Sequence, residues 1–330
     1  MTGGHLLDVR NLFVEFHTRD GVAKVINGVS YHVDAGETLA VLGESGSGKS
    51  VTAQAIMGIL DMPPAAIPSG EIRYAGRDLL ALSPEERRAT RGRDIAMVFQ
   101  DALSALNPVF SVGWQIAETL RQRQGLSKRD ATRRALALMD RVRIPAAAAR
   151  LNDYPHQFSG GMRQRVMIAM ALALDPKVLI ADEPTTALDV TVQAQIMDLL
   201  ADLRRDIGMA LILITHDLGV VANVADRIAV MYAGRIVEHA DVHALYASPA
   251  HPYTRALLQS IPRGQSKGTP LTTIKGLPPN LIRIPAGCPF HPRCAVREPI
   301  CAIDVPPSIE VAPGRTSACH FAVEVLDGRR

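Results

Sequence analysis

Apolar and polar residues alternate along the first part of the chain, from about Leu6 to Val33. A period of two places successive side chains on opposite faces, as in a strand with one buried face. The segment 19–21 interrupts the alternation near its middle and ends in Gly21, a residue that suits a tight turn. The pattern therefore predicts two antiparallel strands joined by a turn.

Short apolar runs and helical patterns follow this alternation. Runs of apolar residues at 39–42, 72–74, 95–99, 178–181 and 211–214 have the composition of strands. Helical patterns cover residues 51–58, 112–124, 128–142 and 165–174. Because residues 101 to about 155 lack strand composition, we expect an α/β core that carries a helical insertion.

A phosphate-binding pattern, G-x-x-x-x-G-K-[ST], lies between the apolar run 39–42 and the helix that follows it. Strand, glycine loop and helix are the context that this pattern requires, and its glycines let successive backbone N–H groups point at phosphates. The helix N-terminus adds a partial positive charge. We expect Lys49 to reach the β- and γ-phosphates and the Ser50 hydroxyl to ligate Mg²⁺. The eight residues are Gly43, Glu44, Ser45, Gly46, Ser47, Gly48, Lys49 and Ser50.

Polar residues stand where the other predicted strands end. In open α/β sheets, ligands bind beyond the carboxyl ends of the strands. Gln100 is therefore expected to reach Mg²⁺ or the attacking water, and Asp182 to hold Mg²⁺. Glu183 is a candidate general base, and His216 is placed to donate a hydrogen bond to the γ-phosphate.

Three further features are candidates for nucleotide contacts. Ser159, Gly160 and Gly161 precede a helical run, so that a capped helix start with free backbone N–H groups predicts a second anion cradle. Asp189 follows the acidic pair closely enough to approach the same site. Phe16 can stack on an adenine ring, with ordinary packing into the core as the alternative.

Composition and charge narrow the class of protein. The 330 residues are 47% hydrophobic but only 4% aromatic, which is typical of an aliphatic α/β protein with one large and one smaller domain. The net charge of +3 gives no global indication of nucleic-acid binding. No apolar run approaches the roughly 20 residues of a membrane span, and the N-terminus lacks the pattern of a signal peptide. We expect a cytoplasmic protein that meets membranes through partners.

The C-terminal tail, residues 251–330, contains 12 of the 22 prolines and all four cysteines. Clustered cysteines in a reducing compartment indicate metal or redox chemistry rather than disulfides. Their spacing lacks the close C-x₂-C pairs of common zinc sites, whereas four thiolates match a [4Fe–4S] cluster. Zinc, with His291 or His320 as substitute ligands, and free or paired thiols remain alternatives. The cysteines are Cys288, Cys294, Cys301 and Cys319.

Taken in order along the chain, these motifs resemble those of ABC-transporter ATPase subunits over about residues 5–250. Further segments resemble the dipeptide/oligopeptide importer branch, and most closely the D-type ATPase subunits of dipeptide permeases. The resemblance implies an ABC ATP-binding domain at residues 1–250, with a helical subdomain at about 101–175, and a peptide-importer extension at 251–330. The segments are Glu44, 99–101, 106–108, 181–191 and 251–254.

The same resemblance implies partners and roles. Two ATPase subunits would bind each ATP between one subunit's phosphate loop and the other's Ser159 and Gly161, with a different chain favoured as the second subunit. Glu183 would polarise the attacking water and His216 would sense the γ-phosphate. Loops after Gln100 would meet two transmembrane permease subunits, served by an extracytoplasmic peptide-binding protein. The chain would lie peripherally on the cytoplasmic face of the membrane, and the related permease subunits suggest the [4Fe–4S] cluster as a cofactor beside ATP and Mg²⁺.

The sequence thus predicts an ATPase that powers the import of dipeptides or oligopeptides. Nickel complexes or glutathione are alternative substrates within the same family. A soluble ABC ATPase acting on nucleic acid or ribosomes is disfavoured, because only one cassette is present and the interval from Gln100 to Ser159 is short. A redox-sensing regulatory subunit is the third class. Met162 stands where the general family signature has Gln, although Met also occurs there in the peptide branch.

Overall fold

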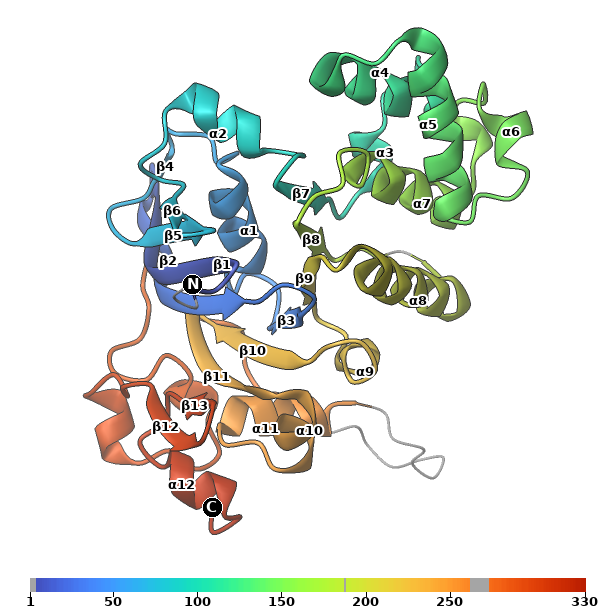
Figure 1. Cartoon of the computed structure of the whole chain (residues 1–330). Helices are drawn as coiled ribbons and strands as arrows, with labels where there is room; N and C mark the ends of the chain where they lie inside the picture. Colours follow the sequence, from blue (N-terminus) through green and yellow to red (C-terminus); the bar gives the residue numbers. More distant parts are fainter. Residues whose placement is uncertain (1–3, 187, 262–272) are drawn as a thin grey trace. The chain divides into compact units, whose positions relative to one another are not determined.

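The structure is a computed structural model that describes residues 4–186, 188–261 and 273–330. The chain forms two compact units (Figure 1). The first unit comprises residues 1–33, 38–80 and 215–330, and the second comprises residues 34–37 and 81–214. The tail is therefore part of the first unit, and the boundary predicted at residue 250 remains a prediction.

An antiparallel sheet opens the first unit and contains the predicted hairpin. Its strands run in the order β2-β1-β5-β6, with β4 paired to β1. Thr18 lies opposite Gly21, which confirms the turn that the alternating pattern predicts. The strands are β1 (Leu7–Thr18), β2 (Gly21–Val33), β4 (Ala65–Ala66), β5 (Glu71–Tyr74) and β6 (Arg77–Asp78).

The first unit also contributes five neighbouring strands to a second sheet, in the order β12-β13-β11-β10-β3. All five residues of β3 are buried, and β3 runs parallel to β10. Strand β3 leads directly through the phosphate loop (residues 43–50) into α1, as the sequence predicts. The elements are β3 (Thr38–Leu42), α1 (Lys49–Met57), β10 (Arg227–Tyr232), β11 (Arg235–Asp241), β12 (Ile309–Ala312) and β13 (Arg315–Ser317).

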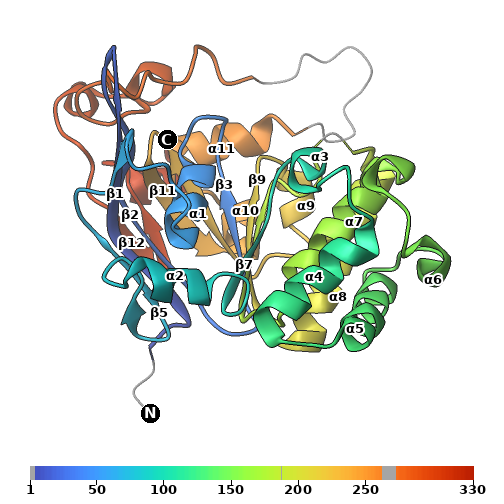
Figure 2. The same ribbon diagram turned by 90° about the horizontal axis from the view of Figure 1, so that it is seen from above.

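The helices of the tail and of the segment before it are short (Figure 2). Helix α11 has proline at its first position, and the His251 ring caps it by accepting a hydrogen bond from the Tyr253 amide at 3.0 Å. Burial lowers the pKa of His251 to about 3, so the ring is neutral at physiological pH. The helices are α9 (Leu218–Val221), α10 (Val242–Ala247), α11 (Pro252–Gln259), α12 (Ala322–Leu326) and the 3₁₀ turns His291–Arg293 and Pro299–Ala302.

The second unit contains three parallel strands in the order β9-β8-β7 and a group of helices. Helices α4 and α5 confirm the helical patterns predicted for residues 112–124 and 128–142. The elements are α2 (Pro84–Thr90), β7 (Ile95–Val98), α3 (Ala102–Ala105), α4 (Val112–Gln124), α5 (Lys128–Arg141), α6 (Ala147–Arg150), the 3₁₀ turn Pro155–Gln157, α7 (Gly160–Ala171), β8 (Val178–Asp182), α8 (Val190–Ile207) and β9 (Ala210–Thr215).

Side-chain caps explain where these helices begin. Ser111, Ser127, Ser159 and Asp189 each accept a hydrogen bond from a backbone N–H in the first turn of the helix that follows. Such caps satisfy amide donors that have no partner inside the helix. The helix starts are therefore encoded locally, by single residues.

No helix within the described ranges is both long and apolar enough to span a membrane.

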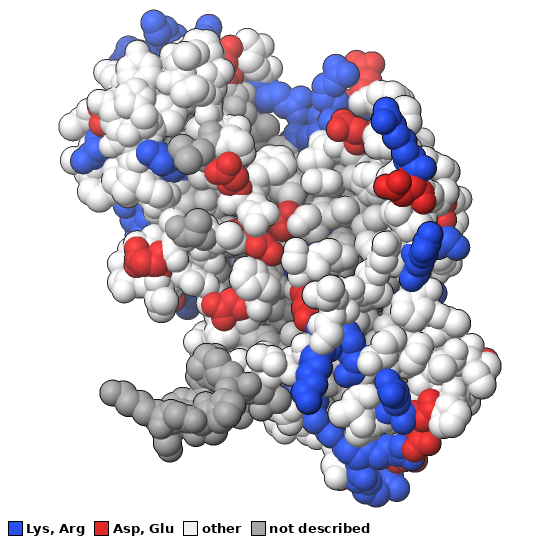
Figure 3. Space-filling view, turned by 180° about the vertical axis from the view of Figure 1, so that it is seen from behind, with Lys and Arg blue, Asp and Glu red and all other residues white. Residues whose placement is uncertain are grey.

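A buried carboxylate ties the tail to β11. The Glu238 side chain is 0% exposed and accepts hydrogen bonds from the Ala250 and His251 amides, at 2.8 and 3.0 Å. It also pairs with Arg315 of β13 at 2.9 Å, whose side chain is 8% exposed. Nearby, the Ser317 hydroxyl donates to the Ala250 carbonyl at 2.9 Å. Lys and Arg side chains gather on the outside of the tail, at the lower right of Figure 3, with Asp and Glu side chains among them.

Replacing Glu238 with alanine is expected to destabilise the first unit. The substitution leaves the buried Arg315 charge and two amide donors without their acceptor, so the free energy of unfolding should fall by about 3–5 kcal/mol. The shift in the urea midpoint measures it. Arg329→Ala, which breaks an exposed pair with Asp327, is the control and should change stability by less than about 0.5 kcal/mol. An unchanged midpoint for Glu238→Ala would contradict this role of the carboxylate.

Candidate nucleotide site and cysteine pocket

The phosphate loop adopts a conformation that only glycine tolerates at two positions. A Cβ atom on Gly43 would lie 2.3 Å from the Met231 carbonyl oxygen. Gly48 has φ 105°, and a Cβ atom there would lie 2.6 Å from the Ile26 Cδ1 atom. The glycines that the sequence pattern requires are therefore fixed by strands β10 and β2, which press against the loop.

Two polar side chains are buried inside the loop. The Lys49 ammonium donates to the Gly43 and Glu44 carbonyl oxygens, at 2.7 and 3.0 Å. The Ser47 hydroxyl is buried and, within the described part of the chain, has no hydrogen-bond partner. A buried hydroxyl without a partner is rare unless a ligand or water completes it. The loop therefore presents a cation and an unsatisfied hydroxyl, as a phosphate site requires, while Ser45 and Gly46 form its exposed tip.

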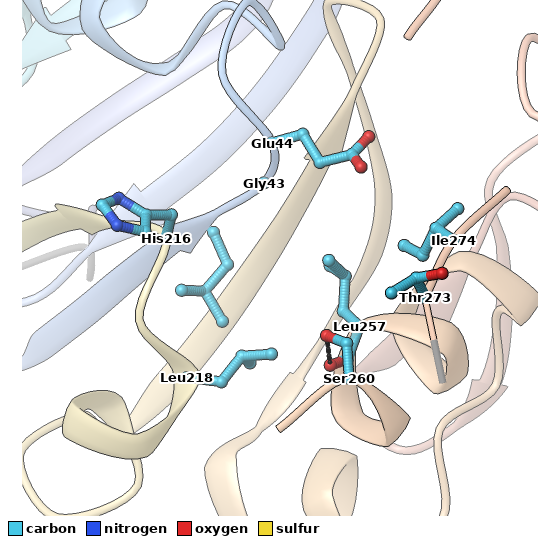
Figure 4. A pocket seen from close by; sticks show the side chains of 9 residues that line it. Gly43, Glu44, His216, Leu218, Leu257, Ser260, Thr273 and Ile274 are labelled. Carbon is cyan, nitrogen blue, oxygen red and sulfur yellow. Dashed lines mark hydrogen bonds between the residues drawn. The ribbon is translucent and has the colours of Figure 1, made fainter. Parts of the chain in front are cut away.

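His216 lies beside this loop in the first unit. Gly43, Glu44 and His216 line one cavity of about 320 Å³ together with Leu257 and Ser260 of the α11 region (Figure 4). In this view the Glu44 carboxylate points away from the His216 ring. The structure thus brings His216 to the start of the phosphate loop, as expected for a residue after the β9 strand.

Phe16 remains a prediction as an adenine contact. It lies on β1, opposite Ala23 of β2 and Ala65 of β4. Its side chain is only half-buried, so it does not fill the interior of the sheet. The half-exposed ring is compatible with stacking on a planar ligand.

In the second unit, Gln100 and Glu183 come together. The Gln100 amide donates to the Glu183 carboxylate at 3.2 Å, and the Thr186 hydroxyl donates to the same oxygen at 2.9 Å. Glu183 has φ 45°, a strained conformation for a residue with a side chain, and its own amide is held by the Ile214 carbonyl at 2.8 Å. Asp182, just before it, is buried at the end of β8. The sequence analysis assigned no role to Thr186, although this residue lies in the segment 181–191 that carries the family resemblance.

The residues at the start of α7 pack against α8. A Cβ atom on Gly160 would lie 3.3 Å from Leu188 Cδ2, and one on Gly161 would lie 2.5 Å from Val192 Cγ1. The Asp189 carboxylate accepts the Val192 amide at 2.9 Å and so caps α8. Gly161 is therefore required by close packing, in addition to the free N–H groups that the sequence suggests.

The four cysteines of the tail line one small pocket of the first unit. All four are free thiols, and Cys301 is buried. Burial raises the pKa of Cys288 to about 11 and that of Cys319 to about 12, because an apolar pocket disfavours the thiolate form. Backbone amides oppose this effect: the Phe321 amide donates to the Cys319 sulfur at 3.4 Å. The other wall residues are His251, Pro252, Phe290, His291, Val296, His320 and Phe321.

Metal binding by these cysteines remains a prediction. Zinc binds four nitrogen or sulfur ligands around one ion, and a [4Fe–4S] cluster binds four thiolates, so the number of cysteines fits both groups. The predicted substitute ligands His291 and His320 each engage a backbone carbonyl, those of Cys288 and Asp304, both at 2.9 Å.

Comparison with known proteins identifies the family. The model of the family "ABC transporter" matches residues 26–186, and that of "Oligopeptide/dipeptide transporter, C-terminal region" matches residues 237–301. The oligopeptide transport ATP-binding protein OppD of Bacillus subtilis is 52% identical, over 93% of this chain and 86% of that protein. The chain belongs to the ABC-transporter ATP-binding proteins, in their oligopeptide/dipeptide branch.

Other relatives and solved structures agree with this membership. The dipeptide transport ATP-binding protein DppD of Lactococcus lactis is 51% identical, over 96% of this chain and 89% of that protein. A dimeric ATP-binding cassette bound to ADP and Pi in a post-hydrolysis state is 26% identical, with a TM-score of 0.64, over 72% of this chain and 98% of that one. The predicted α/β fold of an ABC ATPase is confirmed, and the family membership makes this chain an ATPase coupled to transport.

Replacing Lys49 with alanine is expected to abolish nucleotide binding. Lys49 is expected to donate charge-assisted hydrogen bonds of about 1.5–3 kcal/mol each to the β- and γ-phosphates, so losing them should lower the affinity for ATP at least about a hundredfold. Titration with a fluorescent ATP analogue measures the affinity. The control is Lys177→Ala, which removes an exposed lysine of the second unit and should leave ATP affinity unchanged. Unimpaired binding by Lys49→Ala would remove the lysine from the phosphate site.

Proposed function

We propose that this chain hydrolyses ATP to power the import of dipeptides or oligopeptides. The observation that carries the proposal is the joining, in one chain, of an ABC phosphate loop with the C-terminal region of oligopeptide/dipeptide transporters. Relatives named as oligopeptide and dipeptide transport ATP-binding proteins, matched over more than nine-tenths of the chain, support this substrate class. Nickel complexes and glutathione are the alternatives that the experiment below separates.

The proposed nucleotide contacts are those that the motifs predict. Lys49 and the loop amides would bind the phosphates, and Ser50, Gln100 and Asp182 would hold Mg²⁺. Glu183 would polarise the attacking water, because Gln100 and Thr186 fix its carboxylate. His216 would donate to the γ-phosphate from the start of the loop.

The second anion cradle supports a dimer of ATPase subunits. The start of α7 presents backbone N–H groups behind the Ser159 cap, while Asp189 caps the neighbouring helix α8. In this arrangement Ser159, Gly160, Gly161 and Asp189 would act on ATP bound to the partner subunit. A different ATPase chain is the proposed partner.

Exposed aromatic residues mark a surface for membrane partners. Phe99, Val109, Phe110 and Trp114 are exposed although they are large and apolar. The rings of Phe110 and Trp114 stack with their centroids 4.1 Å apart at the start of α4. Exposed apolar side chains of this size are typical of a protein interface. We propose that these residues contact two transmembrane permease subunits at the cytoplasmic face of the membrane, with an extracytoplasmic peptide-binding protein delivering the substrate.

The cysteine pocket is proposed to hold a [4Fe–4S] cluster. Four free thiols around one pocket match the number of ligands, and zinc is the alternative group. Cys288, Cys294, Cys301 and Cys319 would bind as thiolates, and the amide donated to Cys319 would stabilise its charge. When bound, such a group supplies a one-electron redox centre and a cross-link within a segment poor in regular structure.

The glutamate after β8 gives a direct test of the transport proposal. In proteoliposomes containing the assembled transporter, Glu183→Gln should bind ATP normally, but hydrolysis and uptake of labelled di- and tripeptides should fall about 10²–10⁴-fold. The reason is that the amide cannot take a proton from water.

Two outcomes would contradict the proposal in different ways. Normal turnover by Glu183→Gln would remove this residue from the role of base. Uptake of nickel or glutathione but not of peptides by the unmodified transporter would contradict the substrate class. Asp198→Asn, at a position on α8 away from the strand end, is the control and should transport normally.

Metal and sulfide analysis tests the cluster. Protein purified without oxygen should contain about four iron atoms and four acid-labile sulfides per chain, with broad visible absorption. Replacing both Cys288 and Cys319 with serine should abolish the iron and the absorption while leaving ATP binding by the phosphate loop measurable. Zinc in place of iron, or no metal, would contradict the cluster and leave the ATPase assignment unaffected.

A further inference from the structure

One residue of the phosphate loop is held by the tail. The Glu44 carboxylate forms a two-pronged ion pair with Arg293, at 2.5 and 2.9 Å. Bidentate Arg–carboxylate pairs are among the strongest and most directional polar contacts in proteins. The Arg293 side chain is 5% exposed and that of Glu44 is 26% exposed, so water screens this pair much less than a surface pair.

The backbone of Glu44 is held by a second tail residue. Its amide donates to the Tyr253 hydroxyl oxygen at 2.9 Å. Tyr253 in turn packs against Tyr232 and Phe290, with ring centroids 4.7 and 5.3 Å away. Residue 44 is therefore fixed through both its side chain and its main chain by groups outside the phosphate-binding pattern.

Glu44 passes this constraint on to the residues that face the phosphates. Its carbonyl oxygen accepts a hydrogen bond from the Lys49 ammonium at 3.0 Å and another from the Ser47 amide at 3.2 Å. A shift of Glu44 would consequently move the cation and the amide of the loop together. A preorganised loop binds its ligand more tightly, since less ordering is required on binding.

We propose that Arg293 is a positioning residue for the phosphate loop, and that through Glu44 it sets the affinity of the chain for ATP. Arg293 does not reach the nucleotide in this arrangement, because its guanidinium is occupied by Glu44 and the Tyr232 hydroxyl. It belongs to the same short turn as Cys288 and Cys294, so the tail acts as a clamp on the loop. The inference deepens the proposed function and rests on its nucleotide site.

Two substitutions test whether Arg293 and Glu44 position the phosphate loop or act on ATP only through their charges. Arg293→Met and Glu44→Ala should each lower the ATP affinity of the full chain by about five- to thirtyfold. If the side chains acted only through their charges on the anionic ligand, removing Glu44 would raise the affinity instead. Arg293→Lys keeps the charge but loses the bidentate geometry, and it should recover only part of the affinity.

A double-mutant cycle completes the test. The variant with both Arg293→Met and Glu44→Ala should bind ATP no more weakly than either single variant, since the two side chains act as one unit. Arg283→Met removes an exposed arginine of the same tail and should leave ATP affinity unchanged. Iron content measured on the same samples shows whether a variant acts through the clamp or through loss of the cysteine-bound group.

The outcomes distinguish the clamp from the proposed function itself. Normal ATP affinity in Arg293→Met, or higher affinity in Glu44→Ala, would overturn the clamp while the unmodified chain still binds ATP. Absence of ATP binding by the unmodified chain would instead overturn the nucleotide site. Should Arg293→Met fail to fold, equal affinities of Arg293→Lys and the unmodified chain would overturn the proposal.

Discussion

Burial of parallel strands on both faces is the constraint that organises the chemistry of this chain. All residues of β3, β8 and β9 are buried, so their interiors accept only apolar or paired side chains. The candidate functional groups accordingly lie at the carboxyl ends of the strands. The phosphate loop follows β3, the acidic pair closes β8, and Gln100 and His216 follow β7 and β9.

Much of the fold is predictable because its signals are local. The period of two in residues 6–33, the apolar runs and the capped helices each specify an element without reference to distant parts of the chain. Strands β12 and β13 were not predicted, since they are short and lie in a proline-rich segment. They form through long-range pairing, β13 with β11 and β12 with β13. Their register depends on the buried Glu238–Arg315 pair, whose members are 77 residues apart.

The candidate site likewise contains residues that local motifs predict and contacts that they do not predict. Motif spacing predicts the members of the phosphate loop and the acids after β8, because neighbours in sequence form each cluster. Spacing says nothing of Thr186 holding Glu183, or of Val192 excluding any side chain at position 161. The contact between Glu44 and Arg293 joins residues 249 positions apart, and no local pattern encodes it. The motifs thus predict the functional residues, but they do not predict the long-range contacts that hold those residues in place.

The contact between Arg293 of the tail and Glu44 has a consequence for how the sequences of relatives vary at these two positions. In the phosphate-binding pattern this position is unrestricted, so the nucleotide alone does not dictate its identity. Here a glutamate is required by an arginine in another segment of the chain. Relatives that keep such a tail should exchange the two residues as a pair, whereas chains without it are free to vary position 44. Co-variation between positions 44 and 293 among such relatives would therefore indicate the presence of the clamp.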